Sequence, residues 1–203
     1  MFALVEDGSI TKTLNGNRGI TIGDIQYPRS IYTLWSAAER EAIGIYEVVF
    51  DNTNKKDEAY YNNTNQSFAF ADGVVTASYG SATAKALADA NATNEDGVEL
   101  DPVVVIPGLK TKHKRTIKQQ ASGLLTPTDW YVIKATDVES YSVPSAITTY
   151  RANIRTKSND MEVLIDACST VDELATLYEY VNTGTEENPV MERPLGEFPT
   201  LES

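Results

Sequence analysis

One short segment constrains the fold of this chain more than any other: Leu124-Leu125-Thr126-Pro127-Thr128-Asp129-Trp130. Threonine is favoured at the N-cap of a helix, and proline suits the first helical turn. Asp129 would follow in that turn, where the helix dipole favours a negative charge. The segment therefore predicts that a helix ends near residue 125 and that another begins at once, with Thr126 or Thr128 as its cap.

A further helix is expected over residues 144–157. Its apolar residues recur at spacings of three and four and so form one stripe: Ile147, Tyr150 and Ile154. Arg151 and Arg155 are four residues apart and lie together on a neighbouring face. Two interpretations are open. Asp129 pairs with one of these arginines and holds two helices together, or the arginines contact a partner protein.

Trp130 has the same two interpretations. With Tyr131 it offers a large apolar area to a small helical core, in which case it packs inside. Alternatively, Trp130 contacts a partner, and replacing it would leave the fold intact.

The C-terminal half is predicted to be helical. The expected helices cover residues 110–125, 127–135, 144–157, 160–168 and a segment beginning at the capping box Thr170-Val171-Asp172-Glu173. Residues 110–118 hold the only basic cluster of the sequence. One interpretation is a solvated helix face, onto which the acidic remainder of the chain folds back. The other is a contact with an acidic partner surface or with nucleic acid.

The first 80 residues are typical of antiparallel strands. Asp7-Gly8 and Asp72-Gly73 each separate two apolar segments, which is a strong hairpin signal. Ser36-Ala37-Ala38-Glu39 predicts one short helix, which Gly44 ends. The expected strands are 2–5, 9–13, 20–22, 25–27, 45–50, 58–61, 67–71 and 74–79.

The predicted fold class is α+β, with an antiparallel β-rich domain at 1–80 and a small helical domain at 110–184. Residues 81–109 are expected to form a linker or insert. Its alanine-rich start, 81–92, is weakly helical, and Val103-Val104-Val105-Ile106 is a loop or short strand. A rival interpretation makes that β-branched run an oligomer contact. Residues 185–203 are expected to form an extended acidic tail with three prolines, or one that orders against a partner.

Composition narrows the function classes. A net charge of −12 argues against nucleic-acid binding, which needs a basic face. Cys168, the only cysteine, lies in an apolar run and is interpreted as a small buried hydrophobe. With a single histidine, His113, no multi-histidine metal site is expected. We find no catalytic, cofactor-binding or metal motif, no signal peptide and no membrane span, and expect neither an enzyme nor a small-molecule substrate.

The pattern Leu-Leu-x-x-Thr-Asp-Trp at 124–130, followed by Tyr-Arg-x-x-Ile-Arg at 150–155, resembles the tail assembly chaperone family of tailed bacteriophages. The resemblance covers roughly residues 113–172, and that family also occurs fused or adjacent to tail-fibre-associated proteins. A second pattern begins at Tyr27-Pro28 and continues from Trp35 to Tyr46. It resembles the N-terminal module of phage proteins encoded near tail-fibre genes, which has a strand pair, a short helix and an antiparallel meander.

The resemblances imply a tail structural or tail-fibre-attachment protein that acts by protein–protein contact in the virion. They imply, as an alternative, a tail assembly chaperone that is released after assembly. The extra β-rich domain and the proline-rich tail favour the virion role. Expected partners are other tail or tail-fibre proteins and further copies of the chain, in the virion tail or, during assembly, in the host cytoplasm. The residues expected to bind a partner or join helices are Asp129, Trp130, Tyr150, Arg151 and Arg155.

Overall fold

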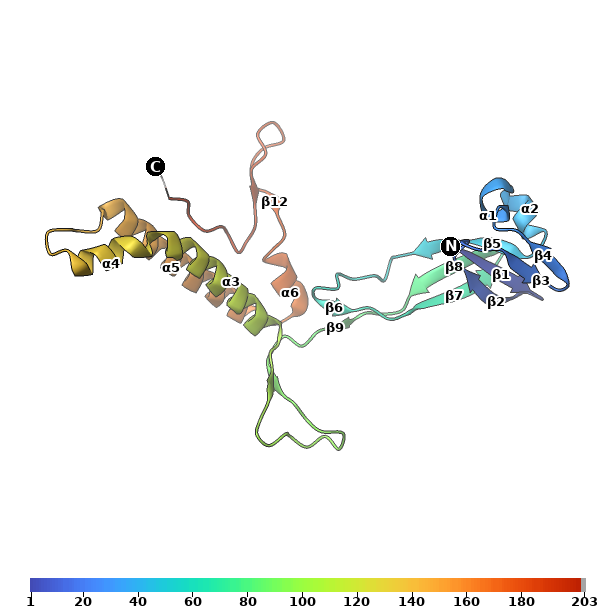
Figure 1. The fold of residues 1–203 in the computed structure, drawn as a ribbon, viewed down its shortest axis with the longest axis horizontal. Helices are drawn as coiled ribbons and strands as arrows, with labels where there is room; N and C mark the ends of the chain where they lie inside the picture. The colour runs from blue at the N-terminus through green and yellow to red at the C-terminus, as the bar shows by residue number, and fades with distance from the viewer. Residues whose placement is uncertain (202–203) are drawn as a thin grey trace. The chain divides into compact units, whose positions relative to one another are not determined.

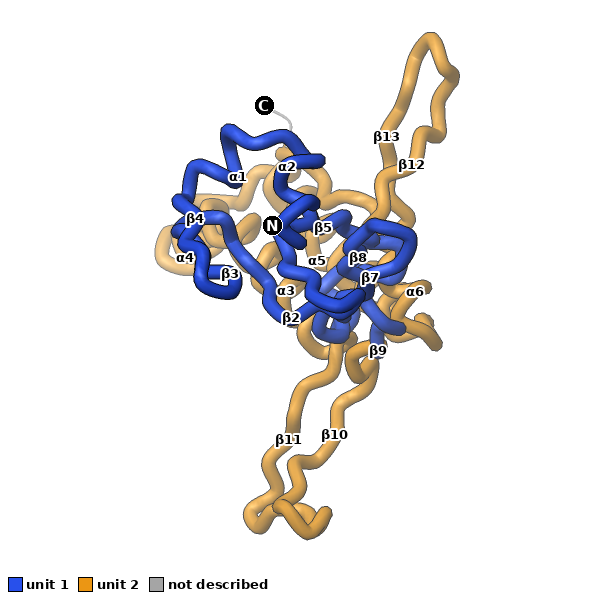
Figure 2. Tube along the Cα trace, turned by 90° about the vertical axis from the view of Figure 1, so that its right-hand side faces the viewer, with its two compact units in different colours: residues 1–83 blue, residues 84–203 orange. Residues whose placement is uncertain are grey.

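The structure is a computed structural model that describes residues 1–201 of the chain. Two compact units make up the chain, Met1–Thr83 and Ala84–Ser203 (Figure 2). The predicted α+β class is confirmed, because a mixed sheet forms in the first unit and the long helices form in the second. The residues expected to form a linker (81–109) and a tail (185–203) fall almost entirely within the second unit.

The sheet of the first unit has five strands in the order β2-β1-β5-β8-β7. Their bounds are β1 (Phe2–Glu6), β2 (Ser9–Leu14), β5 (Ile45–Asp51), β7 (Gln66–Ala71) and β8 (Val74–Tyr79). Strands β5 and β8 are parallel, whereas the other neighbours are antiparallel. The expectation of a wholly antiparallel sheet was therefore wrong. The reason is that β7 returns on the far side of β8, which leaves β8 beside β5.

Both predicted tight turns are present. Asp7 and Asp72 each have a φ of 50°, and Gly8 and Gly73 follow with φ values of 74° and 78°. Two consecutive residues with positive φ are characteristic of the type I′ turn that suits the twist of a hairpin. A Cβ added to either glycine would meet no atom within 4 Å, so backbone conformation alone selects glycine there.

The sheet carries a hydrophobic core on each face. Strands β2 and β7 lie at opposite ends of the strand order yet approach one another, so the sheet curls. The first cluster is Ala3, Val5, Val48, Val75 and Ala77. The second cluster is Leu4, Ile20, Ile31, Tyr32 and Ile45. Successive residues of β1 alternate between these clusters, as the pleat of a strand requires.

Short elements cover the second cluster. They are β3 (Ile20–Ile22), β4 (Ile25–Tyr27), α1 (Ile31–Leu34) and α2 (Ala37–Glu41). The capping box at Ser36 and Glu39 forms as predicted, and Gly44 has a φ of 80°. Sequence reasoning missed Arg40, which is buried. Its Nη1 donates to the Trp35 carbonyl, and its guanidinium lies 5.2 Å from the centre of the Phe2 ring.

Two short strands, β6 (Tyr61–Asn62) and β9 (Thr83–Ala84), pair with each other. The strand expected over 58–61 is therefore largely wrong, because residues 58–60 form a turn. Asp57 organises that turn: its side chain accepts from the Ala59 N–H, and its carbonyl accepts from the N–H groups of Tyr60 and Tyr61.

Two long helices, α3 (Leu109–Leu125) and α5 (Ser145–Ala167), pack side by side in the second unit (Figure 1). Between them lie a 3-10 turn, η1 (Thr126–Thr128), and α4 (Asp129–Asp137), and α6 (Val171–Thr176) follows. Residues 144–157 and 160–168 were expected to be separate helices, but α5 is continuous. Ser158, Met161 and Ile165 extend the buried stripe of Ile154, so packing outweighs the weak helix propensity of the intervening Ser-Asn-Asp.

Two hairpins extend the second unit. Strands β10 (Ala90–Asn91) and β11 (Val105–Ile106) form the first, and β12 (Val181–Asn182) and β13 (Met191–Glu192) form the second. The expectation of weak helix over 81–92 was wrong. Residues 83–84 pair with β6 and residues 90–92 pair with 104–106, so strand pairing outweighs the helix propensity of a few alanines. The C-terminal segment then packs on the helices. Leu195 is fully buried, and Phe198 contacts the cluster of Ala121, Tyr150 and Ile154.

Candidate protein interaction site

An ion pair joins the segment 124–130 to α5. Arg151 is 9% exposed, and its Nη2 lies 2.8 Å from Oδ1 of Asp129. Its Nη1 donates to the Leu125 carbonyl at 3.0 Å and to the Thr128 hydroxyl. Of the two arginines considered for Asp129, the structure pairs it with Arg151. The guanidinium thus bonds three groups in one turn and fixes the start of α4 against α5.

Neither threonine caps α4 with its hydroxyl, contrary to expectation. The Thr126 hydroxyl donates to the Ser122 carbonyl at 2.8 Å, and the Thr128 hydroxyl donates to the Leu125 carbonyl at 2.7 Å. The backbone from α3 into η1 stays helical, so the N–H of Asp129 already bonds the Thr126 carbonyl. With that donor satisfied by the backbone, the hydroxyls bond elsewhere.

Arg155 and Tyr150 lie on the same helix but in different environments. Tyr150 is buried in the cluster between α3 and α5. The Arg155 side chain is exposed, and its Nη1 donates to the Arg151 carbonyl at 3.3 Å. Arg155 therefore leaves guanidinium donors facing solvent beside the Asp129–Arg151 pair.

The ion pair forms one wall of a shallow groove of about 400 Å³ that is open to solvent. Residues of α3, η1, α4 and α5 line it, among them Lys118, Leu125, Asp129, Arg151, Arg155 and Glu162. Lys118 and Glu162 are bonded to each other at 3.1 Å across the two helices. The groove thus combines cations and anions with a small apolar floor, a mixture that suits a polar peptide segment.

No residue of helix α4 is fully buried, although Asp129, Tyr131 and Ala135 are half-buried. Trp130 is 50% exposed, and Val132 and Ile133 are also exposed. The interpretation of Trp130 as a core residue was therefore wrong. The reason is that 130–133 are four consecutive apolar residues, which point to all sides of a helix, whereas α4 packs along only part of its circumference. Val132 and Ile133 were missed, although this unbroken run is the signal that predicts their exposure.

The exposed aromatic surface is locally ordered. The Trp130 ring lies 3.9 Å from the Tyr131 ring, centroid to centroid. Lys134 Nζ lies 5.8 Å from the Trp130 ring and 4.3 Å from the Tyr141 ring. These contacts restrict the rotamers of the side chains, and a restricted surface loses less entropy in any contact that it makes.

The basic cluster at 110–118 is a helix face, as one interpretation predicted. Leu109, Ile117 and Ala121 are buried, while Lys114 pairs with Asp166 at 2.8 Å. The His113 ring packs 4.8 Å from the Tyr178 ring, and burial lowers the pKa of His113.

Cys168 is buried, as expected, and its thiol donates to the Leu164 carbonyl. Burial, with a smaller contribution from the charge of Glu173, raises the pKa of the Cys168 thiol. A raised pKa keeps the sulfur protonated at neutral pH, which is the state of an inert buried cysteine.

Within residues 1–201, no group of three or more His, Cys, Asp or Glu side chains is placed to hold a metal ion. None of the helices in that range combines the length and apolar character needed to cross a membrane. Comparison of the chain with protein-family models, with curated proteins and with solved structures finds no match.

Proposed function

We propose that this chain is a structural or fibre-attachment component of a bacteriophage tail and acts by binding other tail proteins. The resemblance of residues 124–130 and 150–155 to tail assembly chaperones supplies the biological setting. The observation that carries the binding role is the half-exposed Trp130 on α4, a helix in which no residue is fully buried. Exposed tryptophan beside arginine is the composition of an interface hot spot.

The anchoring of α4 supports the same proposal. Arg151 fixes Asp129, the first residue of the helix, so the apolar surface is presented in one orientation. Arg155 lines the shallow groove together with that pair. A partner segment that covers Trp130 and Ile133 would therefore find a polar rim with free guanidinium donors, which is the usual anatomy of an interface.

The second candidate is a non-virion tail assembly chaperone that is released after assembly. The same exposed α4 favours it, because a chaperone also needs an apolar surface for an unassembled client. The two functions differ in where the chain remains. In the first it persists in the virion tail, and in the second it stays in the host cytoplasm.

Peptide mass spectrometry of purified particles of the encoding phage tests this proposal. A virion component is expected to give peptides in a fixed ratio to the other tail proteins. Peptides found in the infected-cell lysate but missing from the particles would instead support the released chaperone. A chain that is missing from the particles and co-purifies with no tail protein from the lysate contradicts both functions.

Trp130→Ala is expected to separate binding from folding. Because Trp130 is 50% exposed, its loss should change the free energy of unfolding by no more than about 1 kcal/mol, well below the ~3–5 kcal/mol of a core tryptophan. Binding to tail proteins should weaken about thirtyfold, the equivalent of ~2 kcal/mol for a hot-spot residue. Urea unfolding and quantitative co-purification from infected cells measure the two effects.

Val163→Ala is the matched control, since Val163 is exposed on α5 and is not among the residues of the groove. Val163→Ala should leave both the free energy of unfolding and the binding to tail proteins unchanged. If Trp130→Ala co-purifies the same tail proteins at the same level as Val163→Ala, α4 is not the binding surface.

A further inference from the structure

Residues 86–108, here called the arm, form a hairpin tied firmly to the start of α3. Oδ1 of Asp89 accepts from the Gly108 N–H at 2.8 Å, and Oδ2 accepts from the Thr111 hydroxyl at 3.0 Å. The Leu109 N–H also donates to the Ala86 carbonyl. The arm projects from this base as a two-stranded ribbon (Figure 2). These hydrogen bonds therefore fix the base of the arm on α3, although the arm itself has only two strands.

The β11 side of the arm is apolar on both faces. Val105 and Ile106 of β11 lie on opposite faces, Val103 and Val104 precede them, and each of the four residues is at least half exposed. A continuous apolar run of this kind is typical of a strand covered from both sides. Within residues 1–201, β11 has one strand neighbour, β10, and a two-stranded ribbon alone is only marginally stable in water. The run at 103–106 thus has the composition of a buried strand, but within residues 1–201 it remains exposed to solvent.

The arm is also uniformly acidic. Between residues 86 and 109 there is no lysine or arginine, while the acidic residues are Asp89, Glu95, Asp96, Glu99 and Asp101. At the base, the Asp89 carboxylate accepts hydrogen bonds from the Gly108 N–H and the Thr111 hydroxyl. These bonds, with a smaller contribution from the charges of Lys114 and Arg115, hold the pKa of Asp89 below its usual range. The four acids beyond it form no ion pair with any other residue in 1–201. A surface that covers the arm must therefore be basic as well as apolar.

Residues 110–118, which begin one residue after Leu109 closes the arm, provide the basic part of that chemistry. Residues 110–118 hold five basic side chains and no acidic one. Lys114 and Lys118 are engaged by Asp166 and Glu162. Lys112 and Arg115 are exposed, are three residues apart on one face of α3, and form no ion pair with the residues that the structure describes.

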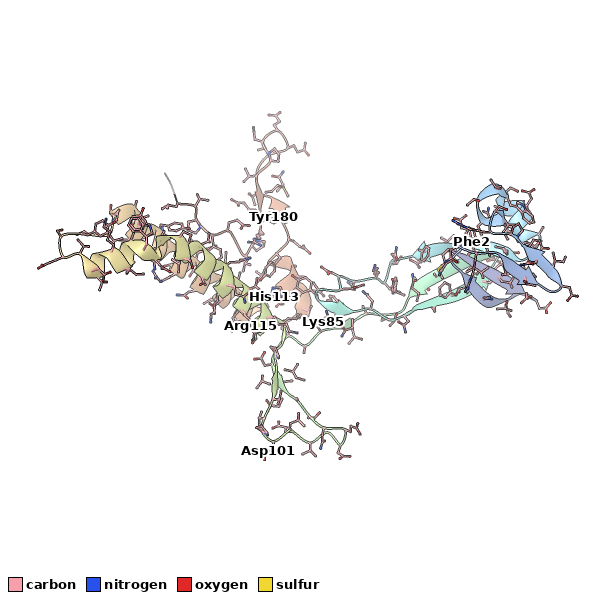
Figure 3. All side chains as sticks on the ribbon, in the orientation of Figure 1. Phe2, Lys85, Asp101, His113, Arg115 and Tyr180 are labelled. Carbon is pink, nitrogen blue, oxygen red and sulfur yellow. The ribbon has the colours of Figure 1, made fainter. Side chains whose placement is uncertain are left out.

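Asp101, unlike Asp89 at the base of the arm, does not reach these bases within one chain. In Figure 3, Asp101 lies toward the far end of the arm, whereas Arg115 lies on α3 near its base. The complementary charges are thus held apart by the arm itself. Two copies of the chain can bring them together.

We propose that the arm of one copy docks on the α3 face of a second copy. Glu99 and Asp101 of the arm then pair with Lys112 and Arg115 of the neighbour, and the apolar run at 103–106 loses its exposure to water. The two surfaces of this contact are different, so each docked copy keeps a free arm or a free helix face. Such a head-to-tail contact closes into a ring or continues as a filament. This self-association uses the arm and α3, whereas the proposed tail-protein site uses α4, so either can fail without the other.

The test uses the full chain and sedimentation velocity over a range of concentrations and salt. The wild-type chain is expected to form species larger than a monomer, and these should dissociate as salt screens the charges. Glu99→Lys with Asp101→Lys reverses the charge of the arm, and Lys112→Glu with Arg115→Glu reverses the charge of the helix face. Each double variant alone should associate at least about tenfold more weakly, because two attractions become repulsions.

An equimolar mixture of the two double variants is the decisive sample. The reversed arm of one variant matches the reversed helix face of the other, and the native arm and helix face match in the remaining pair. Association should therefore return in the mixture. Glu186→Lys with Glu187→Lys makes the same change of charge on exposed residues of the other hairpin, and it should associate as wild type does.

All these positions are exposed, so circular dichroism should show native helix content in every variant. If Lys112→Glu with Arg115→Glu loses helix content, Lys112→Glu alone replaces it in the mixture. A wild-type chain that is monomeric at every concentration, reversed variants that associate normally, or a mixture that gains nothing over its components would each overturn the proposal.

Discussion

Leu195→Ala is expected to lower the free energy of unfolding of the second unit by about 2–5 kcal/mol, the range for a fully buried leucine. Leu195 has no exposed surface, and its N–H donates to the Leu177 carbonyl at 3.0 Å. Its side chain therefore fills part of the core although it lies only eight residues before Ser203. Truncating it leaves a cavity that the neighbouring helices close only in part.

Urea unfolding followed by far-ultraviolet circular dichroism measures this effect. Leu201→Ala is the control, because Leu201 belongs to the same C-terminal segment but is 44% exposed. Its effect should stay within about 0.5 kcal/mol. Equal effects of the two substitutions would contradict the packing of residue 195 in the core.

Arg151→Ala is expected to destabilise the second unit by about 2–3 kcal/mol. The substitution removes bonds to Asp129, to the Leu125 carbonyl and to the Thr128 hydroxyl. Breaking a fully buried pair costs about 3–5 kcal/mol, but the Asp129 side chain is 51% exposed and regains water when its partner is lost. The expected loss is therefore smaller than for a fully buried pair.

Arg155→Ala provides the comparison for this prediction under the same denaturant titration. Its one hydrogen bond, at 3.3 Å to a backbone carbonyl, lies on an exposed side chain, so a change below about 0.5 kcal/mol is expected. Arg151→Lys should fall between the two, because an ammonium keeps the charge but not the forked geometry. A loss for Arg155→Ala as large as that for Arg151→Ala would show that both arginines hold the helices together.

Features that depend on a few neighbouring residues were predictable from the sequence. The turns at Asp7-Gly8 and Asp72-Gly73 follow from the conformational freedom of Asp and Gly. Both capping boxes, at Ser36 and at Thr170, depend on a side chain that reaches three residues along the chain. The α+β class followed from the hairpin signals in the first 80 residues and from the helical spacing and capping signals in the C-terminal half.

Features set by distant partners were not predictable. The stretch 158–160 has the composition of a helix end, yet α5 packs against α3, and the buried Met161 and Ile165 just beyond this stretch keep α5 continuous. Residues 90–92 are extended because residues 104–106 pair with them across the hairpin. In the candidate site, the pairing of Asp129 was foreseen, but the exposure of Trp130 depends on which side of α4 meets the rest of the unit.

The strand order of the first unit governs when it can fold on the ribosome. Strand β1 lies between β2 and β5, and β8 is the parallel neighbour of β5. The β1–β2 hairpin is local and forms early, whereas the β5–β8 pairing must close the loop between Asp51 and Val74. Val75 and Ala77 belong to the first core cluster, so that core stays incomplete until they leave the exit tunnel. Until then the nascent chain exposes one edge of β5, and this is the interval in which it is most open to strand pairing with another chain.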